Sequence, residues 1–446
     1  MDAFHSPAHN TRLGFHYFPD TSHYRESDLL AWLPELRSLG TSWLTLIAPT
    51  DRAIPELFIH GLLSAGIEPI LQFPFNLSEP PNPGDISMLF DAYAKWGVHY
   101  TLLFDRPNSR SAWSVASWTQ EDLVERFLDR FLPLAEIASK AGLDPVFPPL
   151  EPGGNYWDTA FLHTALQSLL RRKKQALLDH LALSAYAWTN ERSLNWGAGG
   201  PARWPGARPY FTPPTEEDQR GFRIFDWYRA ISHSVLPRPC PIILLGVGSP
   251  WDHTLKTNPV SNPVVHAQTN FTIARLVTGE GVNDPVKPEI VLEQMPVEVI
   301  ACNFWLLAAA LGSPYLQQAW FQPEGQTMPV VGTIRQWFAH SEETHSPVDA
   351  APAAKNTHTI GHYLLLPHYE WGIADWHLEV IRPFVKKYTP TIGFSLAEAT
   401  HAGRVTVIGN QNSYSDDDLN MLRNAGCIVE RISGDGTSIA TQLAER

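Results

Sequence analysis

The sequence predicts an α/β protein: a (β/α)₈ barrel followed by a small three-layer α/β domain with a mainly parallel sheet. Short apolar runs alternate with amphipathic helical segments through the first three-quarters of the 446 residues, which is typical of parallel strands joined by helices. Eight such repeats are the pattern of a barrel. Residues 341–358 are rich in Ala, Pro, Ser and Thr and lack periodicity, so they predict a linker between a barrel at 1–340 and a second domain at 359–446.

The eight predicted barrel strands are short apolar runs, each followed by a loop and a helical segment. The last strand is assigned to 315–321, after a predicted helix at 297–310. The strands are expected at residues 13–18, 43–48, 68–73, 100–104, 144–148, 180–187, 241–245 and 315–321.

Amphipathic segments with recognisable ends separate these strands. Asp28 can cap the first helix, which stops at Gly40, and the long helix at 121–141 stops at Gly142. The basic run at 171–174 complements the negative end of a helix dipole, so we interpret it as a solvated helix end. In the second domain, strands at 361–366, 404–408 and 427–432 alternate with helices at 375–387, 416–425 and 438–445.

Composition narrows the functional classes. Hydrophobic residues make up 44% and charged residues 18% of the chain, which supports a sizeable core and argues against disorder. The net charge of −13 disfavours nucleic acid and anionic membrane surfaces as partners. Sixteen Trp residues favour carbohydrate as the partner, because indole stacks on sugar rings, although large barrels also bury many aromatic side chains.

The sequence predicts no metal and no cofactor. Cys240, Cys302 and Cys427 are far apart, and neither they nor the scattered histidines have metal-ligand spacing, so we expect free buried thiols in a reducing compartment. The first residues lack a basic and apolar leader pattern. No apolar stretch approaches the roughly 20 residues of a membrane span. These features predict a soluble, cytoplasmic protein.

Polar and aromatic side chains at the carboxyl ends of the strands are the candidates for function, because those ends build the site of a barrel. The loop at 195–210 places aromatic residues among Gly and Pro; it either exposes them for ring stacking or packs them rigidly onto the barrel. The candidate substrate-binding residues are His16, Tyr17, Arg106, Asn108, Trp188, Asn190, Trp196, Trp204 and Trp320.

Three segments resemble the large clan of (β/α)₈ retaining glycoside hydrolases. They are the opening GFHYFP at 14–19, the DRPN at 105–108 and the PIILL at 241–245. The resemblance implies a general acid/base at Arg106 and a nucleophile at Gly246. Neither residue can perform that role, since Arg holds its proton and Gly has no side chain, whereas retention requires two carboxyl groups about 5 Å apart.

Other carboxylates are candidates to replace the missing pair. Glu151 lies before a Gly-rich loop, and Asp105 or Asp252 is the second candidate. Asp105 and Arg106 are adjacent, so strand alternation predicts that only one of them points into the barrel mouth. An inverting pair separated by roughly 6.5–9.5 Å fits such loops. Alternatively, Glu151 pairs with an arginine or caps the following helix.

Two hypotheses follow. The first is a carbohydrate-active barrel of the glycoside hydrolase type, with an atypical or reduced catalytic set, that binds glycans at its C-terminal face. The alternative is a non-catalytic glycan-binding or assembly scaffold, and a third is another chemistry in which Arg106 binds an anionic group. The segment 404–446 resembles one repeat of bacterial cell-wall-binding modules. A packing or assembly role, including homo-oligomer formation through this domain, is equally open.

Overall fold

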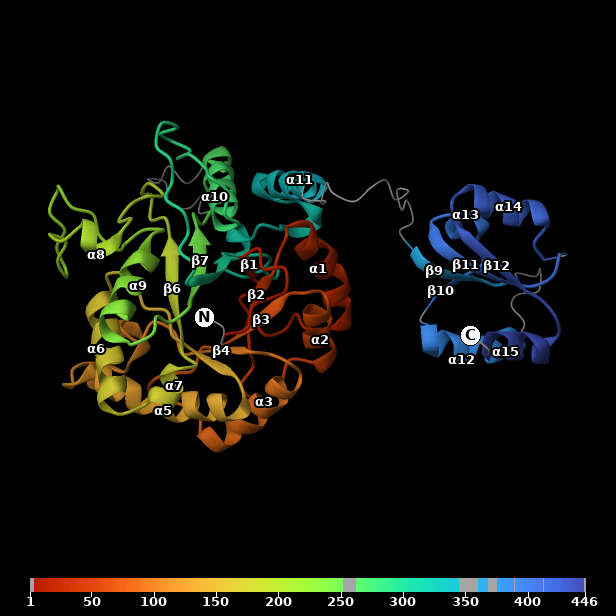
Figure 1. Ribbon diagram of the computed structural model, residues 1–446. Coiled ribbons are helices and arrows are strands. Elements are labelled where there is room, and N and C mark those ends of the chain that lie inside the picture. The colour runs from red at the N-terminus through yellow and green to blue at the C-terminus, as the bar shows by residue number, and fades with distance from the viewer. Residues whose placement is uncertain are drawn as a thin grey trace. The chain divides into compact units, whose positions relative to one another are not determined.

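The computed structural model describes residues 4–251, 262–344, 360–367, 375–388, 390–411 and 413–444. The chain divides into two compact units, Met1–His345 and Ser346–Arg446, which are described separately below (Figure 1).

The first unit is a closed barrel of eight parallel strands in sequential order, as the sequence predicts. β1 closes the barrel by pairing with both β2 and β8. The strands are almost wholly buried, which explains why they are near-continuous apolar runs and not alternating ones. Their bounds are β1 Leu13–His16, β2 Trp43–Ile47, β3 Glu68–Phe73, β4 Tyr100–Leu103, β5 Asp144–Phe147, β6 Ala182–Trp188, β7 Ile242–Gly248 and β8 Val299–Phe304.

Helices surround the barrel on its outside (Figure 1). Local signals fix their ends: the Asn82 side chain accepts from the Gly84 amide at the start of α3, and Gly142, with φ 98°, ends α5. The helices of this unit are α1 Glu26–Ser38, α2 Glu56–Ser64, α3 Pro83–Lys95, α4 Val115–Trp118, α5 Leu123–Ala141, α6 Asp158–Arg171, α7 Gln175–Leu178, α8 Gly200–Arg203, α9 Ile224–Val235, α10 Pro263–Val277 and α11 Pro329–Thr344.

The prediction for the eighth strand was wrong. β8 lies within the segment 297–310 that was expected to be helical, and Leu316–Gln318, inside the expected strand, is a 3₁₀ turn. A short buried apolar run has no helical or alternating period, so its pattern cannot distinguish strand from helix. Pairing decides the outcome: β8 joins β7 on one side and β1 on the other, which closes the barrel.

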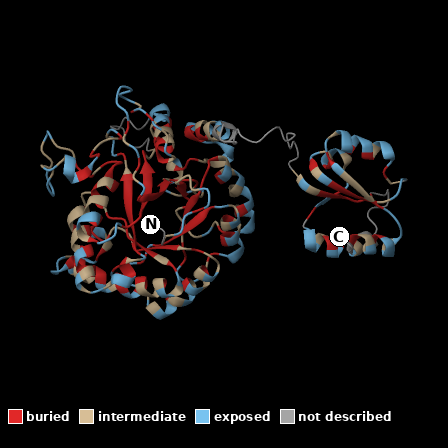
Figure 2. Ribbon diagram, viewed as in Figure 1, coloured by how far each residue is buried: buried red, intermediate tan, exposed pale blue. Residues whose placement is uncertain are grey.

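Two layers of apolar side chains hold the barrel together, and buried residues follow the strands and the inner faces of the helices (Figure 2). The inner layer fills the barrel with side chains such as Trp43, Tyr100 and Ile243. A larger outer layer, which includes Phe127 and Leu166, lies between strands and helices. The three cysteines are free and buried, as predicted.

The second unit is a four-stranded parallel sheet in the order β10-β9-β11-β12. α12 and α15 lie on one face and α13 and α14 on the other (Figure 1), so the predicted three-layer arrangement is confirmed. The short edge strand β10 and the short helix α13 were not predicted. The bounds are β9 Ile360–Leu365, α12 Asp375–Tyr388, β10 Thr391–Gly393, α13 Leu396–Ala399, β11 Ala402–Ile408, α14 Asp416–Asn424, β12 Ile428–Ile432 and α15 Gly436–Ala444.

Two sequence predictions concern residues that lie partly or wholly outside the described part of the chain. α11 runs to Thr344, so the predicted linker begins within a helix, and its residues 345–358 lie outside the described residues. Asp252 also lies outside them. Within the described part of the chain, every helix is too short or too polar to cross a bilayer.

Candidate functional site

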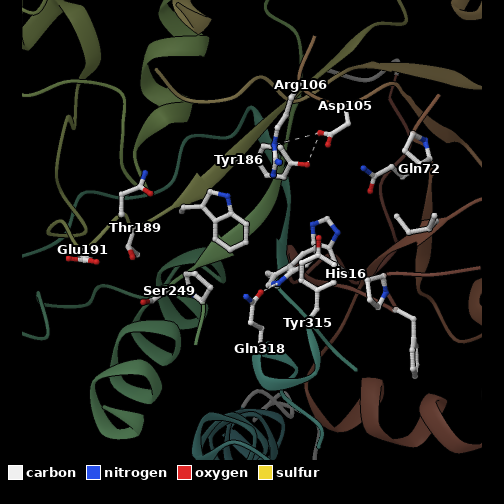
Figure 3. A pocket seen from close by; sticks show the side chains of 18 residues that line it. His16, Gln72, Asp105, Arg106, Tyr186, Thr189, Glu191, Ser249, Tyr315 and Gln318 are labelled. Carbon is white, nitrogen blue, oxygen red and sulfur yellow. Dashed lines mark hydrogen bonds and ion pairs between the residues drawn. The ribbon is translucent and has the colours of Figure 1, made fainter. Parts of the chain in front are cut away.

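A pocket of about 510 Å³ opens at the carboxyl ends of the barrel strands, where barrel enzymes carry their sites. Each side contributes a strand end or the loop that follows it: His16 from β1, Gln72 from β3 and Trp188 from β6. The loop after β8 adds Trp305 and Tyr315 (Figure 3). The volume is within the usual range of small-molecule sites, about 300–1,000 Å³.

Asp105 and Arg106 both line this pocket, contrary to the prediction that only one of them would. β4 ends at Leu103, and the backbone then leaves the extended conformation, with φ of 69° at Phe104 and 44° at Arg106. Side-chain alternation holds only along a strand. The turn after β4 therefore brings the acidic side chain of Asp105 and the basic side chain of Arg106 to the same barrel mouth.

Arg106 is surrounded by groups that neutralise its charge. Its guanidinium lies 4.5 Å from the centre of the Tyr186 ring. Its Nε lies 3.1 Å from Glu151 Oε2 and 4.0 Å from Asp105 Oδ1. The prediction that Glu151 pairs with an arginine matches this geometry. With two carboxylates and an aromatic face around Arg106, an anionic ligand would compete with these groups for the guanidinium.

Asp105 is held by a side chain of β6, two strands along the barrel from β4. The Tyr186 hydroxyl donates a hydrogen bond of 2.8 Å to Asp105 Oδ1 (Figure 3). Burial raises the pKa of Asp105 above its ordinary value, although Arg106 and the Tyr186 hydroxyl oppose the shift. Burial and the Asp105 charge also raise the pKa of Tyr186 well above its ordinary value, so the phenol keeps its proton. Burial thus shifts the protonation equilibrium of Asp105 toward the neutral form, relative to an exposed aspartate.

The position where the resemblance implies a nucleophile is closed. Gly246 has a φ of 53°, and a Cβ built on it would lie 2.4 Å from the Trp188 ring. The Gly246 amide donates to His16 Nε2 at 3.1 Å. Burial, and then the Arg106 charge, lower the pKa of His16 to about 3, so the ring is neutral near pH 7 and carries its hydrogen on Nδ1. The indole of Trp188 occupies the space that a longer side chain would need.

Aromatic rings form much of the pocket wall. Trp188 stacks on Tyr186 with ring centres 6.2 Å apart and meets Trp305 edge-on at 6.1 Å. Trp305 Nε1 donates to Gln318 Oε1 at 2.7 Å, and Tyr315 packs against the same indole at 5.4 Å. Uncharged residues with hydrogen-bonding side chains complete the pocket lining; they are His16, Gln72, Thr189, Asn190, Ser249 and Gln318.

Several predicted site residues lie away from the pocket. Tyr17 is buried between β1 and the surrounding helices, against Tyr24 and Phe58. Trp320 is buried against Phe15 and Phe304. Neither side chain faces the barrel mouth, because the strand ends that carry candidate residues also carry core residues.

Hydrogen bonds join the Asn108 side chain to the backbone of Glu151 beside the pocket. The buried Asn108 amide donates to the Glu151 and Tyr156 carbonyls, at 2.9 Å each, and accepts from the Glu151 backbone amide at 2.8 Å. Glu151 borders a neighbouring open hollow that shares Arg106 with the pocket. These contacts fix the loop after β5 and thereby the ion pair of Glu151 with Arg106.

Trp196 and Trp204, in the loop after β6, pack within that loop and do not line the pocket. Arg192 lies 4.2 Å from the Trp196 ring centre, and the Trp196 Nε1 donates to Asp218 at 3.1 Å. Trp204 Nε1 donates to the Ala198 carbonyl at 3.0 Å. Both indoles are half-buried, so the loop packs part of each ring and leaves the rest exposed, away from the pocket.

Trp305, Tyr315 and Gln318 are pocket residues that the sequence interpretation missed. All three follow β8, and the misplaced eighth strand hid them. The run ending in Phe304 followed by Trp305 was the available signal, because a Trp directly after a buried apolar run fits a strand end. Within the described residues, the pocket holds no group of three His, Cys, Asp or Glu side chains close enough to bind a metal.

No protein-family model and no curated protein sequence matches the chain, so the resemblance of 404–446 to a cell-wall-binding repeat finds no support. Solved structures similar to this chain are mostly glycoside hydrolases. Exo-β-1,4-mannosidase Op5Man5 from Opitutaceae bacterium strain TAV5 has 12% identity and a TM-score of 0.35, over 97% of this chain and 79% of that one.

A cold-adapted β-galactosidase from Rahnella sp. R3 has 10% identity and a TM-score of 0.44, over 96% of this chain and 71% of that one. Fructose-bisphosphate aldolase from Plasmodium falciparum has 11% identity and a TM-score of 0.35, over 73% and 82%. Because barrels of different chemistry match at the same level, these similarities do not select an activity.

Proposed function

We propose that this protein binds a glycan through a sugar residue seated in the pocket at the mouth of the barrel, without the two-carboxylate machinery of retaining glycosidases. The observation that carries the proposal is the composition of the pocket wall. Trp188, Trp305 and Tyr315 offer aromatic surface for the apolar faces of a sugar ring. Gln72, Asn190 and Gln318 offer uncharged donors and acceptors for its hydroxyl groups.

A neutral ligand suits the charges of the pocket. Arg106 lies against Asp105, Glu151 and the Tyr186 ring, so an anionic ligand would have to compete with two carboxylates for one guanidinium. The chain itself carries a net charge of −13, which repels anions at long range. Uncharged hydroxyl groups meet neither obstacle.

Among the described residues, the positions that the resemblance assigns to the catalytic pair carry no carboxylate for double-displacement hydrolysis, and Asp252 lies outside those residues. Retaining enzymes place two carboxyl groups about 5 Å apart, and here the resemblance assigns those positions to Arg106 and Gly246. Trp188 fills the space beside Gly246. The two carboxylates that line the pocket are Asp105 and Glu191, and they lie on opposite sides of it in Figure 3.

Acid catalysis by Asp105 is the second candidate function. A carboxyl group with a raised pKa in a pocket can donate a proton to a leaving group, and the pKa of Asp105 is raised by burial. This alternative needs a water activated by another group, since Glu191 lies across the pocket from Asp105 in Figure 3. It predicts slow turnover that Asp105→Asn abolishes.

The test is a binding titration of a panel of neutral oligosaccharides by isothermal titration calorimetry, with Trp188→Ala and Trp204→Ala compared with the unsubstituted protein. Trp188→Ala should weaken binding by about tenfold or more, which corresponds to about 1.4 kcal/mol. Trp204→Ala is the matched control, because Trp204 lies outside the pocket, and it should leave the affinity unchanged. Equal losses in both variants, or binding of no sugar in the panel, would contradict the proposal.

A further inference from the structure

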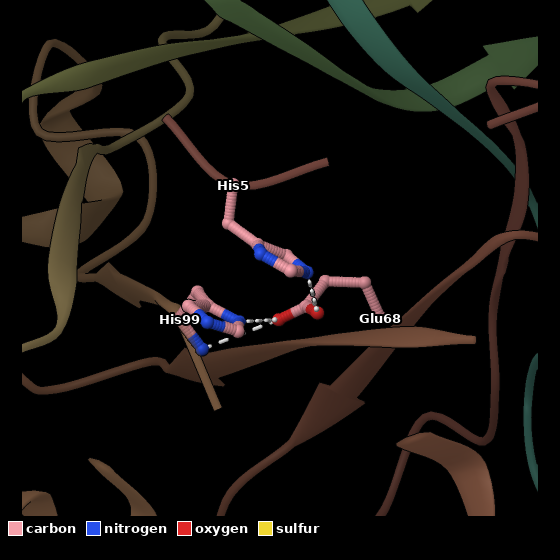
Figure 4. A group of neighbouring side chains, drawn as sticks. All are labelled: His5, Glu68 and His99. Carbon is pink, nitrogen blue, oxygen red and sulfur yellow. Dashed lines mark hydrogen bonds and ion pairs between the residues drawn. The ribbon is translucent and has the colours of Figure 1, made fainter. Parts of the chain in front are cut away.

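A second cluster of functional side chains lies at the other end of the barrel, around the amino ends of the strands. Glu68 is the first residue of β3, His99 directly precedes β4, and His5 belongs to the N-terminal segment. In a barrel of parallel strands, these positions are opposite the pocket. Figure 4 shows both imidazole rings turned toward the one carboxylate.

The donor atoms of the cluster are close together. His5 Nε2 is 3.3 Å from Glu68 Oε2, and His99 Nδ1 is 3.0 Å from Glu68 Oε1. One ligand atom from each of the three residues lies within 4.8 Å of the others. The Glu68 side chain is only 2% exposed, whereas those of His5 and His99 are 42% and 35% exposed. A buried carboxylate thus has two imidazoles on its open side.

Contacts that do not involve Glu68 hold His5 at this place. The Tyr100 hydroxyl, which comes from inside the barrel, donates to the His5 carbonyl at 2.6 Å. Phe4 packs against the inner core of the barrel. Asn10 receives a hydrogen bond from Trp43 Nε1 at 2.8 Å and donates to the Ile300 carbonyl at 3.1 Å. The N-terminal segment is therefore anchored across the barrel floor on both sides of His5.

We propose that His5, Glu68 and His99 form a binding site for a divalent transition-metal ion of the zinc class, which fastens the N-terminal segment to the barrel floor. Two imidazoles and one carboxylate are a ligand set that Zn²⁺ takes, with water in the remaining position. The three residues are far apart in the sequence, at positions 5, 68 and 99. For that reason the spacing of histidines in the sequence did not indicate the site.

Binding the ion requires a defined local change. The two imidazole rings stack with centres 3.6 Å apart and planes within 5°, and their nitrogens each face an oxygen of Glu68, so at least one ring must turn for both to bind one ion. Metal–ligand bonds of about 2.0–2.2 Å place neighbouring donors about 3.3 Å apart. His5 lies in an exposed part of the segment, and a rotation of its ring closes the set without moving β3.

The surroundings favour a cation. Asp144, the first residue of β5, donates its backbone amide to the His99 carbonyl at 2.6 Å, and its carboxylate accepts from His180 Nδ1 or pairs with it at 3.0 Å. Two carboxylates, Glu68 and Asp144, thus flank the imidazoles. In the absence of metal, the same residues form a network of hydrogen bonds and ion pairs, which is the competing explanation of the cluster.

The test uses the full chain after chelator treatment, titrated with zinc chloride alone by calorimetry and, in parallel, with cobalt(II), whose visible spectrum reports coordination by nitrogen. We expect one saturable zinc per chain, cobalt absorption that differs from the hydrated ion, and a higher temperature of thermal unfolding with zinc. His5→Ala should weaken zinc binding by at least about tenfold, the lower end of the losses seen when partners of metal ligands are removed.

Two further variants make the outcome decisive. His60→Ala removes a histidine that pairs with Glu56 at 3.2 Å on α2 and, among the described residues, belongs to no group of three metal-binding side chains, so this variant should bind zinc like the unsubstituted chain. His99→Gln repeats the test on a ligand held by the barrel, in case the change at His5 alters the segment. The absence of saturable zinc binding, or equal binding by His5→Ala and His60→Ala, would overturn the proposal and leave the cluster as an ion-paired network.

Discussion

The closed nucleophile position predicts an unusual cost for the smallest possible substitution, Gly246→Ala. The residue has a φ of 53°, and the added Cβ would lie 2.4 Å from Cζ2 and 2.6 Å from Cε2 of Trp188. Both distances are far inside van der Waals contact. Tyr186 and Trp305 flank the indole, so it must shift out of its packed position, toward the pocket, to relieve the clash.

The loss of unfolding free energy expected for Gly246→Ala has two parts. A left-handed backbone costs a residue with a Cβ about 1–2 kcal/mol, and overpacking a buried site costs about 1–3 kcal/mol more. The unfolding free energy of the barrel should therefore fall by about 2–5 kcal/mol. Gly66→Ala is the matched control, because Gly66 has a φ of 75° and open space around its Cβ position; it should show only the first part, about 1–2 kcal/mol.

Urea unfolding of the barrel, followed by far-ultraviolet circular dichroism, measures both variants. Trp188→Ala combined with each glycine substitution completes a double-mutant cycle. Removing the indole should reduce the difference between the Gly246 and Gly66 variants to within about 0.5 kcal/mol. If Gly246→Ala and Gly66→Ala cost the same while Trp188 is present, the indole does not fill the nucleophile position and the reasoning fails.

Three other perturbations test the site and the domain organisation. Because burial raises the pKa of Asp105, the folded protein binds the Asp105 proton more tightly than the unfolded chain does. Stability should therefore fall as the pH rises from about 3.9 through the raised pKa. Asp105→Asn should flatten that part of the profile of unfolding temperature against pH, and an unchanged profile would contradict the assignment. Glu151→Gln removes a half-exposed partner of Arg106, so stability should fall by no more than about 1 kcal/mol while sugar affinity stays the same, and a large loss of affinity or turnover would show that Glu151 acts on the ligand. A broad-specificity protease should first cut within 341–358, whose composition predicts a linker between two compact units; first cuts elsewhere would move the boundary.

Periodicity predicted the barrel because seven of its strands are separated by amphipathic helices with clear ends, such as the one at Gly142. It failed at β8, where the six residues Val299–Phe304 are apolar except for Asn303, a pattern that a buried helix also tolerates. Only pairing with β1 and β7 distinguishes the two, and pairing is a property of the closed barrel. The same limit left the three-residue edge strand β10 unrecognised.

The candidate site was predictable where a residue is the last one of a strand and so keeps the extended backbone. His16 and Trp188 line the pocket for this reason. Asp105 and Arg106 share the mouth because of two positive φ angles after β4, which no sequence pattern encoded. Trp196 and Trp204 lie half-buried within their loop, held by hydrogen bonds to Asp218 and Ala198, partners that the loop's composition did not indicate.

The most direct test of the central claim is a crystal structure of the protein soaked with the tightest-binding neutral oligosaccharide. The proposal predicts a sugar ring within the pocket, with its apolar face against Trp188 or Trp305 and its hydroxyl groups bonded to residues such as Gln72 and Asn190. It also predicts an intact glycosidic bond, since Gly246 supplies no nucleophile. A sugar bound elsewhere on the barrel, or a covalent glycosyl–protein bond in the pocket, would contradict it.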